Sequence, residues 1–409
     1  MIATCNCRFC QTPLKHSFAD LGMSPLSNAF LTVEQLNQAE KFYPLHAYVC
    51  ENCFLVQLEA FETPDAIFSD YVYFSSYSTS WLNHAQQYTN SMIENYQFNL
   101  QHLVIEIASN DGYLLQYFKQ YHIPVLGIEP AKNVAQVALE KGIPTETAFF
   151  GVETAKNLVA RGQSANLLIA NNVLAHVPDI NDFVAGLKLL LKPQGIITIE
   201  FPHLLNLIVQ NQFDTIYHEH FSYLSLLAVE NIFAQHGLML FDVEELATHG
   251  GSLRIYACHQ GMQSINPRIF ALRAKEKAAN LGKLERYTQF LNQVTALKRD
   301  LLHCLIEIKN QNKQIAAYGA AAKGNTLLNY CGIRQDFIEY VADLNPHKQN
   351  KYLPGTHIPV CSPEQLKITQ PAYVLILPWN LQIEIMQQLA FIREWGGQFI
   401  IPIPDVQIL

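Results

Sequence analysis

Residues 104–115 read Val-Ile-Glu-Ile-Ala-Ser-Asn-Asp-Gly-Tyr-Leu-Leu, an apolar run that leads through small residues into a helical pattern. A second apolar run, at residues 125–128, ends in Glu129. The two oxygens of a carboxylate at such a position can accept hydrogen bonds from the vicinal hydroxyls of a ribose. This stretch therefore predicts a strand–turn–helix unit whose turn binds a nucleotide-like cofactor.

The same rhythm continues along the chain. Residues 165–170 form a third apolar run followed by the polar segment 171–176, and residues 195–202 form a fourth run. Strands that alternate with helices in this way predict a doubly wound, mostly parallel sheet, with its ligand beyond the carboxyl ends of the strands. The turn departs from the G-x-G-x-x-G pattern because Ala108 and Asn110 fill the first two small positions. A plain strand–helix connection is the alternative interpretation of that turn.

The amino-acid composition and the net charge exclude several classes of protein. Of the 409 residues, 49% are hydrophobic, which excludes intrinsic disorder and provides for two or three domain cores. The formal net charge of −8 argues against a nucleic-acid backbone as the main partner. The sequence shows neither a leader-like N-terminus nor an apolar run long enough to span a bilayer. We therefore expect a cytoplasmic protein that has no membrane partner.

Five of the nine cysteines lie within residues 1–53. Cys7 and Cys10 form one C-x-x-C pair, and Cys50 and Cys53 form another. Two such pairs can supply a tetrahedral, all-thiolate zinc shell, which leaves no open position for a reactive water. The sequence therefore predicts a structural Zn²⁺ site, with Cys5 as a spare thiol that could compete as a ligand. Four unliganded buried thiols and a redox site are the alternatives.

The last third of the chain repeats the strand–turn–helix theme. Residues 267–314 predict long helices, whose stripe of Leu and Ile is typical of core contacts. Residues 318–325 then read Tyr-Gly-Ala-Ala-Ala-Lys-Gly-Asn, a small-residue turn that opens a helix. Further apolar runs at 338–342, 373–377 and 398–402 predict the other strands of a second α/β unit.

Residues 217–220, Tyr-His-Glu-His, place a phenol, two imidazoles and a carboxylate within one short segment. Imidazole is a base with a pKa near neutrality, a carboxylate can orient it, and a phenol can donate to a developing oxyanion. The two histidines are spaced i and i+2, unlike the i and i+4 pair of a helical zinc site. We expect catalysis at this segment, with a metal site or a structural polar loop as the alternatives. The aromatic and hydroxyl-rich residues 70–78 predict a lid over the cofactor, or alternatively a packed hinge between modules.

Together these residues resemble the nucleotide-sugar C-methyltransferases, class I S-adenosylmethionine (SAM) enzymes that act on deoxysugars. The resemblance rests on residues 106–112, 129–130 and 217–223, and it extends to the two cysteine pairs, to Leu21-Gly-x-x-Pro-Leu-x-Asn-Ala-Phe30 and to residues 318–329. It implies an α/β protein with a class I SAM methyltransferase Rossmann-like domain, a small N-terminal zinc-binding domain and a second, C-terminal Rossmann-like domain. The expected ranges are 1–66 for the zinc-binding domain, 67–265 for the methyltransferase domain and 266–409 for the C-terminal domain.

The reaction that the resemblance implies is methylation of C-3 of a 4-keto nucleotide-activated deoxysugar. A sugar carbon becomes nucleophilic only after a proton next to a ketone is removed, so the reaction needs a base and donors for the enolate oxygen. The resemblance makes His220 the base, with Tyr217 and Glu219 in support and with His176 and Tyr71 as further active-site residues. An O- or N-methyltransferase and a non-enzymatic zinc- and nucleotide-binding module are the alternatives.

The expected binding residues lie in the same motifs. The turn at 319–324 opens a helix, Lys323 adds positive charge, and Asp343 has a ribose-like spacing. We expect this turn to bind the nucleotide diphosphate of the sugar; a second cofactor site and a purely structural domain are the alternatives. We also expect a monomer or small homo-oligomer. SAM contacts are expected from Glu106, Ala108, Asn110, Gly112, Tyr113, Glu129 and Asn171, and substrate contacts from Tyr73, Ser75, Lys323 and Asn325.

Overall fold

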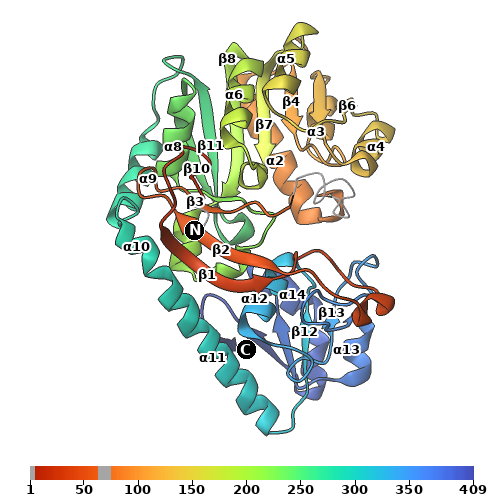
Figure 1. Ribbon diagram of the computed structural model, residues 1–409. Helices are drawn as coiled ribbons and strands as arrows, with labels where there is room; N and C mark the ends of the chain where they lie inside the picture. Colours follow the sequence, from red (N-terminus) through yellow and green to blue (C-terminus); the bar gives the residue numbers. More distant parts are fainter. Residues whose placement is uncertain (1–4, 63–74) are drawn as a thin grey trace.

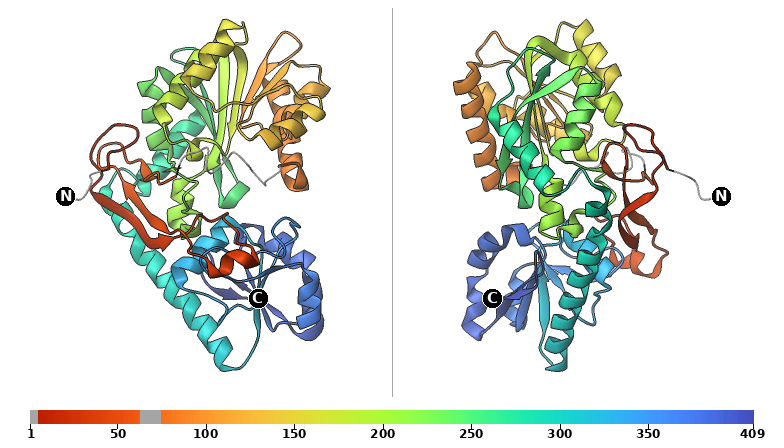
Figure 2. Two further views of the ribbon diagram at one scale, coloured as in Figure 1. Left: turned by 45° about the vertical axis from the view of Figure 1, so that its right-hand side comes forward. Right: turned by 90° about the vertical axis from the view of Figure 1, so that its left-hand side faces the viewer.

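The computed structural model describes residues 5–62 and 75–409, which form three β-sheets. Figure 1 shows an upper body that contains the central sheet, a lower body that contains the C-terminal sheet, and the N-terminal strands between them. The further views in Figure 2 show the long helix α11 (Phe290–Asn310) running along the lower body. Across the described residues, no helix combines the length and the apolar character needed to cross a membrane.

The central sheet has the strand order β10-β11-β8-β7-β4-β5-β6. Among its described strands, β11 alone runs antiparallel to its neighbours, β8 and β10, while the other pairs are parallel. The predicted doubly wound, mostly parallel sheet is therefore confirmed, whereas the sequence patterns did not predict the β10–β11 hairpin. The strands are β4 (Val104–Ile107), β5 (Val125–Ile128), β6 (Thr145–Glu146), β7 (Ala165–Asn171), β8 (Leu191–Pro202), β10 (Leu238–Leu246) and β11 (Ser252–His259).

Helices cover both faces of this sheet (Figure 1), and the two-residue period of a strand explains why. Ile105 and Ile107 of β4 pack in the cluster that includes α5, α6 and α8, whereas Val104 packs on the opposite face with α2 and α3. Because both faces are covered, every residue of β4 is buried. The helices are α2 (Thr79–Tyr96), α3 (Leu115–Gln120), α4 (Lys132–Glu140), α5 (Val152–Ala160), α6 (Ile180–Leu190), α7 (Leu204–Val209), α8 (Leu226–Gln235) and α9 (Pro267–Ala278).

The N-terminal sheet is antiparallel and has the order β1-β2-β3-β9. Its last strand, β9 (Ser222–Tyr223), comes from the middle of the chain and pairs with β3 (Val56–Leu58). The other two strands are β1 (His16–Ser24) and β2 (Tyr43–Val49). Residues 21–24 of the motif that begins at Leu21 belong to β1, with an irregular register where Gly22 adopts a φ of 74°.

The C-terminal sheet has the order β14-β13-β12-β15-β16-β17, and only its last pair is antiparallel among the described strands. The predicted strand at 338–342 is wrong in length: β13 spans only Val341–Ala342. The reason is that Ile338 N–H still bonds to the Arg334 carbonyl, so the chain is closing a turn at that point. The elements are β12 (Ile315–Tyr318), α12 (Ala322–Cys331), β14 (Val360–Cys361), α13 (Glu364–Thr369), β15 (Tyr373–Ile376), α14 (Gln382–Gln388), β16 (Gln398–Ile401) and β17 (Gln407–Ile408).

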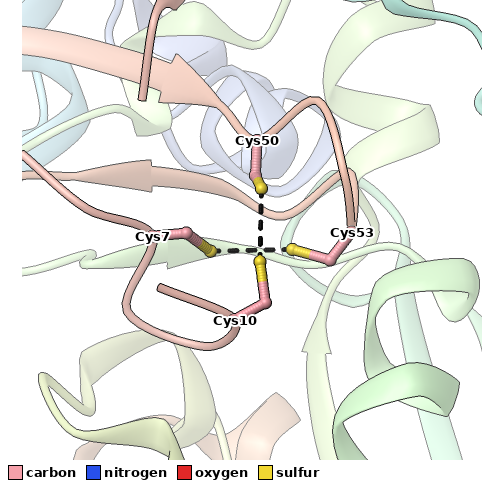
Figure 3. Close-up of side chains that lie close together, drawn as sticks. All are labelled: Cys7, Cys10, Cys50 and Cys53. Carbon is pink, nitrogen blue, oxygen red and sulfur yellow. Dashed lines mark hydrogen bonds between the residues drawn. The ribbon is translucent and has the colours of Figure 1, made fainter. Parts of the chain in front are cut away.

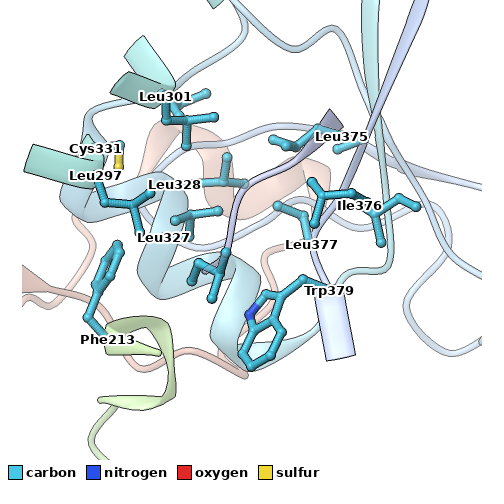
Figure 4. Packing of buried hydrophobic residues seen from close by; sticks show 14 of the residues in the cluster. Phe213, Leu297, Leu301, Leu327, Leu328, Cys331, Leu375, Ile376, Leu377 and Trp379 are labelled. Atoms are coloured by element: carbon cyan, nitrogen blue, oxygen red, sulfur yellow. The ribbon is translucent and has the colours of Figure 1, made fainter. Parts of the chain in front are cut away.

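Helix α11 joins the N-terminal and C-terminal sheets into one apolar cluster. Its buried residues recur at three- and four-residue spacing, which confirms that the Leu and Ile stripe makes core contacts. Near its beginning, Phe290 stacks on Phe18 of β1, with ring centroids 4.7 Å apart. Further along, Leu297 and Leu301 lie near Leu327 and Leu328 of α12, as Figure 4 shows. The five-residue helix α10 (Leu284–Thr288) leads into α11.

The stacked pair of Phe18 and Phe290 allows a test of this core. Phe290 is fully buried, so we expect Phe290→Ala to lower the free energy of unfolding by about 3–5 kcal/mol, through lost burial and the cavity left behind. Urea titration followed by circular dichroism measures this change. Phe270→Ala is the matched control: Phe270 is 54% exposed, so the substitution should change the free energy of unfolding by no more than about 0.5 kcal/mol. Equal effects of the two substitutions would contradict this description of the core.

Candidate active site and metal centre

The turn after β4 has an unusual backbone. Ala108, Asn110 and Gly112 all adopt positive φ, of 52°, 50° and 76°. For a residue with a Cβ this conformation costs about 1–2 kcal/mol, and such strain concentrates at functional sites. Gly112 has no room for a side chain, because a Cβ there would lie 2.9 Å from Ile143 Cγ1. The turn is therefore more constrained than a plain strand–helix connection requires.

Glu129, at the end of β5, stabilises this turn. Its Oε2 accepts from the Asn110 backbone N–H at 2.9 Å, and its Oε1 accepts from the Ala131 N–H at 2.8 Å. Each carboxylate oxygen keeps acceptor capacity for a ribose hydroxyl. On the other side of the turn, the Ser75 N–H donates to Asn110 Oδ1 at 2.8 Å. Residue 75, at the edge of the predicted lid, thus lies at the cofactor turn; Tyr71 and Tyr73 lie outside the described residues.

Buried acceptors at this edge of the sheet suit SAM. Within the described part of the chain, Glu106 Oε2 and Asn171 Oδ1 are buried without a hydrogen-bond partner. Leaving such atoms unsatisfied is unfavourable, so each one implies a donor from a ligand or water. Burial raises the pKa of Glu106 well above its usual value, and a hydrogen bond with Tyr113 opposes that shift. The ammonium group and ribose hydroxyls of SAM are donors of the kind these atoms lack, so the residues present fit this cofactor.

The segment after the 3₁₀ turn Phe213–Thr215 holds the candidate base, His220. Its Nδ1 lies 2.9 Å from the Thr215 carbonyl oxygen, and its Nε2 lies 2.9 Å from the Tyr217 hydroxyl. Because a carbonyl can only accept, Nδ1 carries the proton, and Nε2 is left with its lone pair. Burial lowers the pKa of His220 well below its usual value, and the neighbouring His176 lowers it further. The ring is therefore neutral at pH 7, with a basic nitrogen beside a phenol.

His176 reaches the same place from the end of β7. Its Nδ1 donates to the Glu219 carbonyl oxygen at 2.7 Å, and its ring lies 4.7 Å from that of His220. Burial lowers the pKa of His176 to about 4, so this imidazole is also neutral at pH 7. The Glu219 carboxyl accepts from Asn28 Nδ2 at 2.6 Å, and burial raises its pKa. The structure thus brings His176, Tyr217, Glu219 and His220 together.

The geometry of residues 217–220 does not support a metal site there. His218 turns away from His220 and points its Nε2 to the Pro44 carbonyl of β2, 3.2 Å away. Its ring lies edge-on to Tyr43 and Phe61. Among the described residues, the only group of three or more potential metal ligands is the N-terminal cysteine cluster.

The C-terminal domain contributes a cation and an indole. Trp379 Nε1–H donates to Asp214 Oδ2 at 2.7 Å, and burial raises the pKa of Asp214 to about 6. Lys323 Nζ donates to Asn380 Oδ1 at 2.9 Å and lies 4.9 Å above the Trp379 ring. Burial lowers the pKa of Lys323, while Asp214 opposes that shift. Lys323 therefore points toward the catalytic segment and away from the amides of its own turn.

Two other residues predicted near that turn have partners within the protein. Asn325 is 1% exposed, and its Nδ2 lies 3.4 Å from the Ser27 carbonyl oxygen. Asp343 Oδ2 accepts from the Ala320 N–H at 2.6 Å, which occupies one donor of the turn. This contact repeats the one between Glu129 and the Asn110 N–H, so the two α/β units share it.

Sequence reasoning missed His249, in the loop between β10 and β11. His249, Gly250 and Gly251 have φ values of 55°, 87° and 111°. A Cβ at Gly250 would lie 2.7 Å from the Trp379 ring. The His249 ring lies 5.4 Å from that of Trp81, and its Nε2 lies 3.4 Å from Asn172 Nδ2, next to the cofactor edge. A His-Gly-Gly run between two apolar runs was the sequence signal for it.

The four predicted zinc ligands converge (Figure 3). The Sγ atoms of Cys7, Cys10, Cys50 and Cys53 all lie within 4.8 Å of one another, with Cys7–Cys53 at 3.6 Å and Cys10–Cys50 at 3.5 Å. A tetrahedral shell with Zn–S bonds of about 2.3 Å needs S···S separations of about 3.8 Å. Gln57 Nε2 also donates to Cys7 Sγ at 3.2 Å, as expected for a thiolate ligand. The donor set and its spacing fit Zn²⁺, and Cys5 is not part of the cluster.

This geometry makes a prediction about metal content. We expect about one zinc per chain in purified protein, because four thiolates complete the shell of one ion. Cys50→Ser should lose most of that zinc and become less soluble, whereas the control Cys304→Ser, outside the cluster, should keep it. Elemental analysis by mass spectrometry measures both. A well-folded wild-type protein without metal would contradict the zinc assignment.

Known protein families match all three parts of the chain. Family models match residues 7–68 ("Putative zinc binding domain"), 84–243 ("Methyltransferase domain") and 247–404 ("C-methyltransferase C-terminal domain"). The C-methyltransferase NovU of Streptomyces niveus is 33% identical over 404 residues, which is 98% of this chain and 96% of the relative.

Solved structures match part of this chain. The magnesium protoporphyrin IX methyltransferase of Synechocystis with bound SAM is 13% identical, with a TM-score of 0.34, over 44% of this chain and 79% of that one. A SAM-dependent methyltransferase of Clostridium acetobutylicum is 9% identical, with a TM-score of 0.37, over 44% of this chain and 92% of that one. At these values the structural matches carry no argument by themselves. The family models and the relative do: the chain belongs to the SAM-dependent C-methyltransferases, with a zinc-binding N-terminal domain and a second α/β domain at its C-terminal end.

Proposed function

We propose that the protein methylates C-3 of a 4-keto nucleotide-activated deoxysugar, with His220 as the base that removes the C-3 proton. The single observation that carries this proposal is the geometry of His220, whose Nδ1 lies 2.9 Å from the Thr215 carbonyl oxygen and whose Nε2 lies 2.9 Å from the Tyr217 hydroxyl. The name of the relative NovU, a C-methyltransferase, supports transfer to carbon. SAM supplies an electrophilic methyl group when bound.

His220 acts through Nε2. The Tyr217 hydroxyl first turns from Nε2 to the ketone oxygen, which frees the Nε2 lone pair. Nε2 then takes the proton next to the ketone and becomes an N–H donor to the Tyr217 oxygen, while the Tyr217 hydroxyl donates to the enolate oxygen. The Thr215 carbonyl keeps its bond to Nδ1 throughout and stabilises the positive charge on the ring.

His176 and Glu219 set the position of this base. The Glu219 carbonyl fixes the His176 ring, and that ring packs 4.7 Å from His220. A second cation there would be repelled, so the neutral state of His176 helps His220 to accept a proton. Asn28 binds the Glu219 carboxyl and so orients the residue whose carbonyl holds His176.

We assign the diphosphate of the nucleotide sugar to the side of the candidate site that carries Lys323. Its ammonium group donates to the Asn380 side chain, lies over the Trp379 ring and is near enough to His220 to lower the pKa of that imidazole. A diphosphate would supply further acceptors and compensate the buried charge. This placement leaves the sugar end of the substrate toward His220.

Methyl transfer from ¹³C-methyl SAM to a panel of 4-keto nucleotide sugars tests the proposal. NMR should locate the new methyl group on C-3 of at least one sugar, bound carbon to carbon. A methyl group on oxygen or nitrogen would make the protein an O- or N-methyltransferase. SAM binding without transfer to any 4-keto sugar would count against a sugar substrate of this class.

A His220→Ala variant tests the base. Because the imidazole would be gone while the turn after β4 is untouched, we expect methyl transfer to be abolished and the Kd for SAM to stay nearly unchanged. Isothermal titration calorimetry and a methyl-transfer assay measure the two properties. His218→Asn is the matched control, since His218 bonds to Pro44 and not to the candidate site. Substantial turnover in His220→Ala would remove His220 from this role.

The pH dependence of kcat/KM for the sugar tests the protonation state of His220, because this parameter reports pKa values of the free protein. Since burial holds the pKa of His220 well below its usual value, the basic form persists as pH falls, and kcat/KM should stay constant from pH 8 to below pH 6.5. The Asp214→Asn variant is measured in parallel, because the pKa of Asp214 is raised to about 6 and its protonation would add a second acid limb. An acid limb at or above pH 6.5 in both proteins would contradict a neutral His220.

A further inference from the structure

Arg8 lies inside the zinc knuckle, between Cys7 and Cys10, yet its side chain leaves the metal site. Its backbone N–H donates to Gln57 Oε1 at 2.8 Å, and the same Gln57 side chain donates to Cys7 Sγ. The Arg8 backbone is therefore fixed by a residue that also contacts a zinc ligand. Its carbonyl accepts from Asn181 Nδ2 at 3.2 Å, which attaches the knuckle to the start of α6.

The guanidinium of Arg8 binds two carbonyls and a ring. Nη1 donates to the Pro178 carbonyl oxygen at 2.6 Å, and Nη2 donates to the Leu58 carbonyl oxygen. The Arg8 Cζ lies 5.4 Å from the centre of the Phe221 ring. A planar guanidinium can hold these three partners at once, because its donors leave in fixed directions and its face can lie against a ring.

All three partners adjoin the candidate catalytic histidines. Pro178 follows His176 by two residues, and Phe221 comes directly after His220. The Leu58 N–H donates to the Phe221 carbonyl oxygen at 3.0 Å, so Leu58 contacts the segment of His220 through its N–H and Arg8 through its carbonyl. One side chain therefore spans the loop of His176 and the segment of His220.

We infer that Arg8 is a positioning residue, which holds His176 and His220 in register and couples their geometry to the zinc-bound knuckle. This inference rests on the proposed function of the two histidines. Arg8 touches neither reacting group; it acts by fixing the Pro178 carbonyl and the Phe221 ring, and the bond from His176 to the Glu219 carbonyl then sets the distance between the two imidazole rings. Zinc thereby affects catalysis without contact with the substrate.

The test uses the full-length zinc-loaded protein and the variants Arg8→Lys and Arg8→Met. Lysine keeps the charge but cannot bind both carbonyls in a plane. We expect zinc content and the Kd for SAM to stay unchanged, while kcat falls about tenfold to a hundredfold and the sugar KM changes little, as for a misplaced base. Arg273→Met is the matched control, because Arg273 also pairs with polar groups and lies 5.4 Å over a ring, Phe270, away from the site.

A second readout does not need turnover. In ¹⁵N-histidine NMR spectra, wild-type His176 and His220 should both show the Nδ1–H tautomer, because each Nδ1 faces a carbonyl. Arg8→Lys should show a mixture of tautomers at one or both rings, which a mere loss of stability would not produce. Unchanged kcat and unchanged tautomers in zinc-loaded Arg8→Lys and Arg8→Met would overturn the inference.

If both Arg8 variants lose zinc, the Phe221→Leu variant tests the inference instead, because it removes the ring under the guanidinium without altering the zinc knuckle. A tautomer shift at His220 in that variant supports the inference, and wild-type spectra overturn it. An inactive wild-type protein that shows both Nδ1–H tautomers would instead count against the proposed function.

Discussion

Trp379 donates its indole N–H to Asp214, and this bond is one of several contacts that hold residues 214–223 from three sides. The C-terminal domain supplies Trp379, and the N-terminal sheet supplies β3, which pairs with Ser222 and Tyr223. The central sheet supplies His176, which bonds to the Glu219 carbonyl. The proposed base, His220, lies within this segment, so its position depends on all three sheets at once.

That constraint explains the electrostatics of the candidate site. A segment enclosed from three sides is largely removed from water, and burial favours the neutral forms of His176 and His220. Backbone carbonyls then select the tautomer, because each Nδ1 donates to an oxygen that can only accept. Burial thus leaves the proposed base free of its proton at neutral pH, and the proposal needs no charged partner to activate it.

Local patterns in the sequence predicted the parts of the molecule that depend on near neighbours. The strand and turn at 104–112, the acid at Glu129 and the cysteine pairs each carry their signal within a few residues. Two C-x-x-C pairs can be combined from the sequence because the chemistry of zinc demands four ligands. The same reasoning identified residues 217–220 by their side-chain types.

Local sequence patterns could not predict the contacts between residues that are distant in the chain. Nothing local indicates that Ser222 and Tyr223 complete the N-terminal sheet, that His218 faces β2 while His220 faces Tyr217, or that Trp379 meets Asp214. Lys323 was correctly noted as a cation, but its direction, toward Asn380 and Trp379, depends on packing between domains. His249 was missed because a histidine before two glycines gains meaning only when the loop meets the cofactor edge.

The most direct measurement is exchange of the sugar proton for deuterium, separated from methyl transfer. The wild-type protein is incubated in D₂O with S-adenosylhomocysteine, which cannot donate a methyl group, and with the 4-keto nucleotide sugar that accepts one. The account predicts that NMR will show loss of the C-3 proton signal with the wild-type protein and its persistence with His220→Ala. Exchange that continues at the wild-type rate in His220→Ala, or methyl transfer by the wild-type protein without loss of that proton, would contradict it.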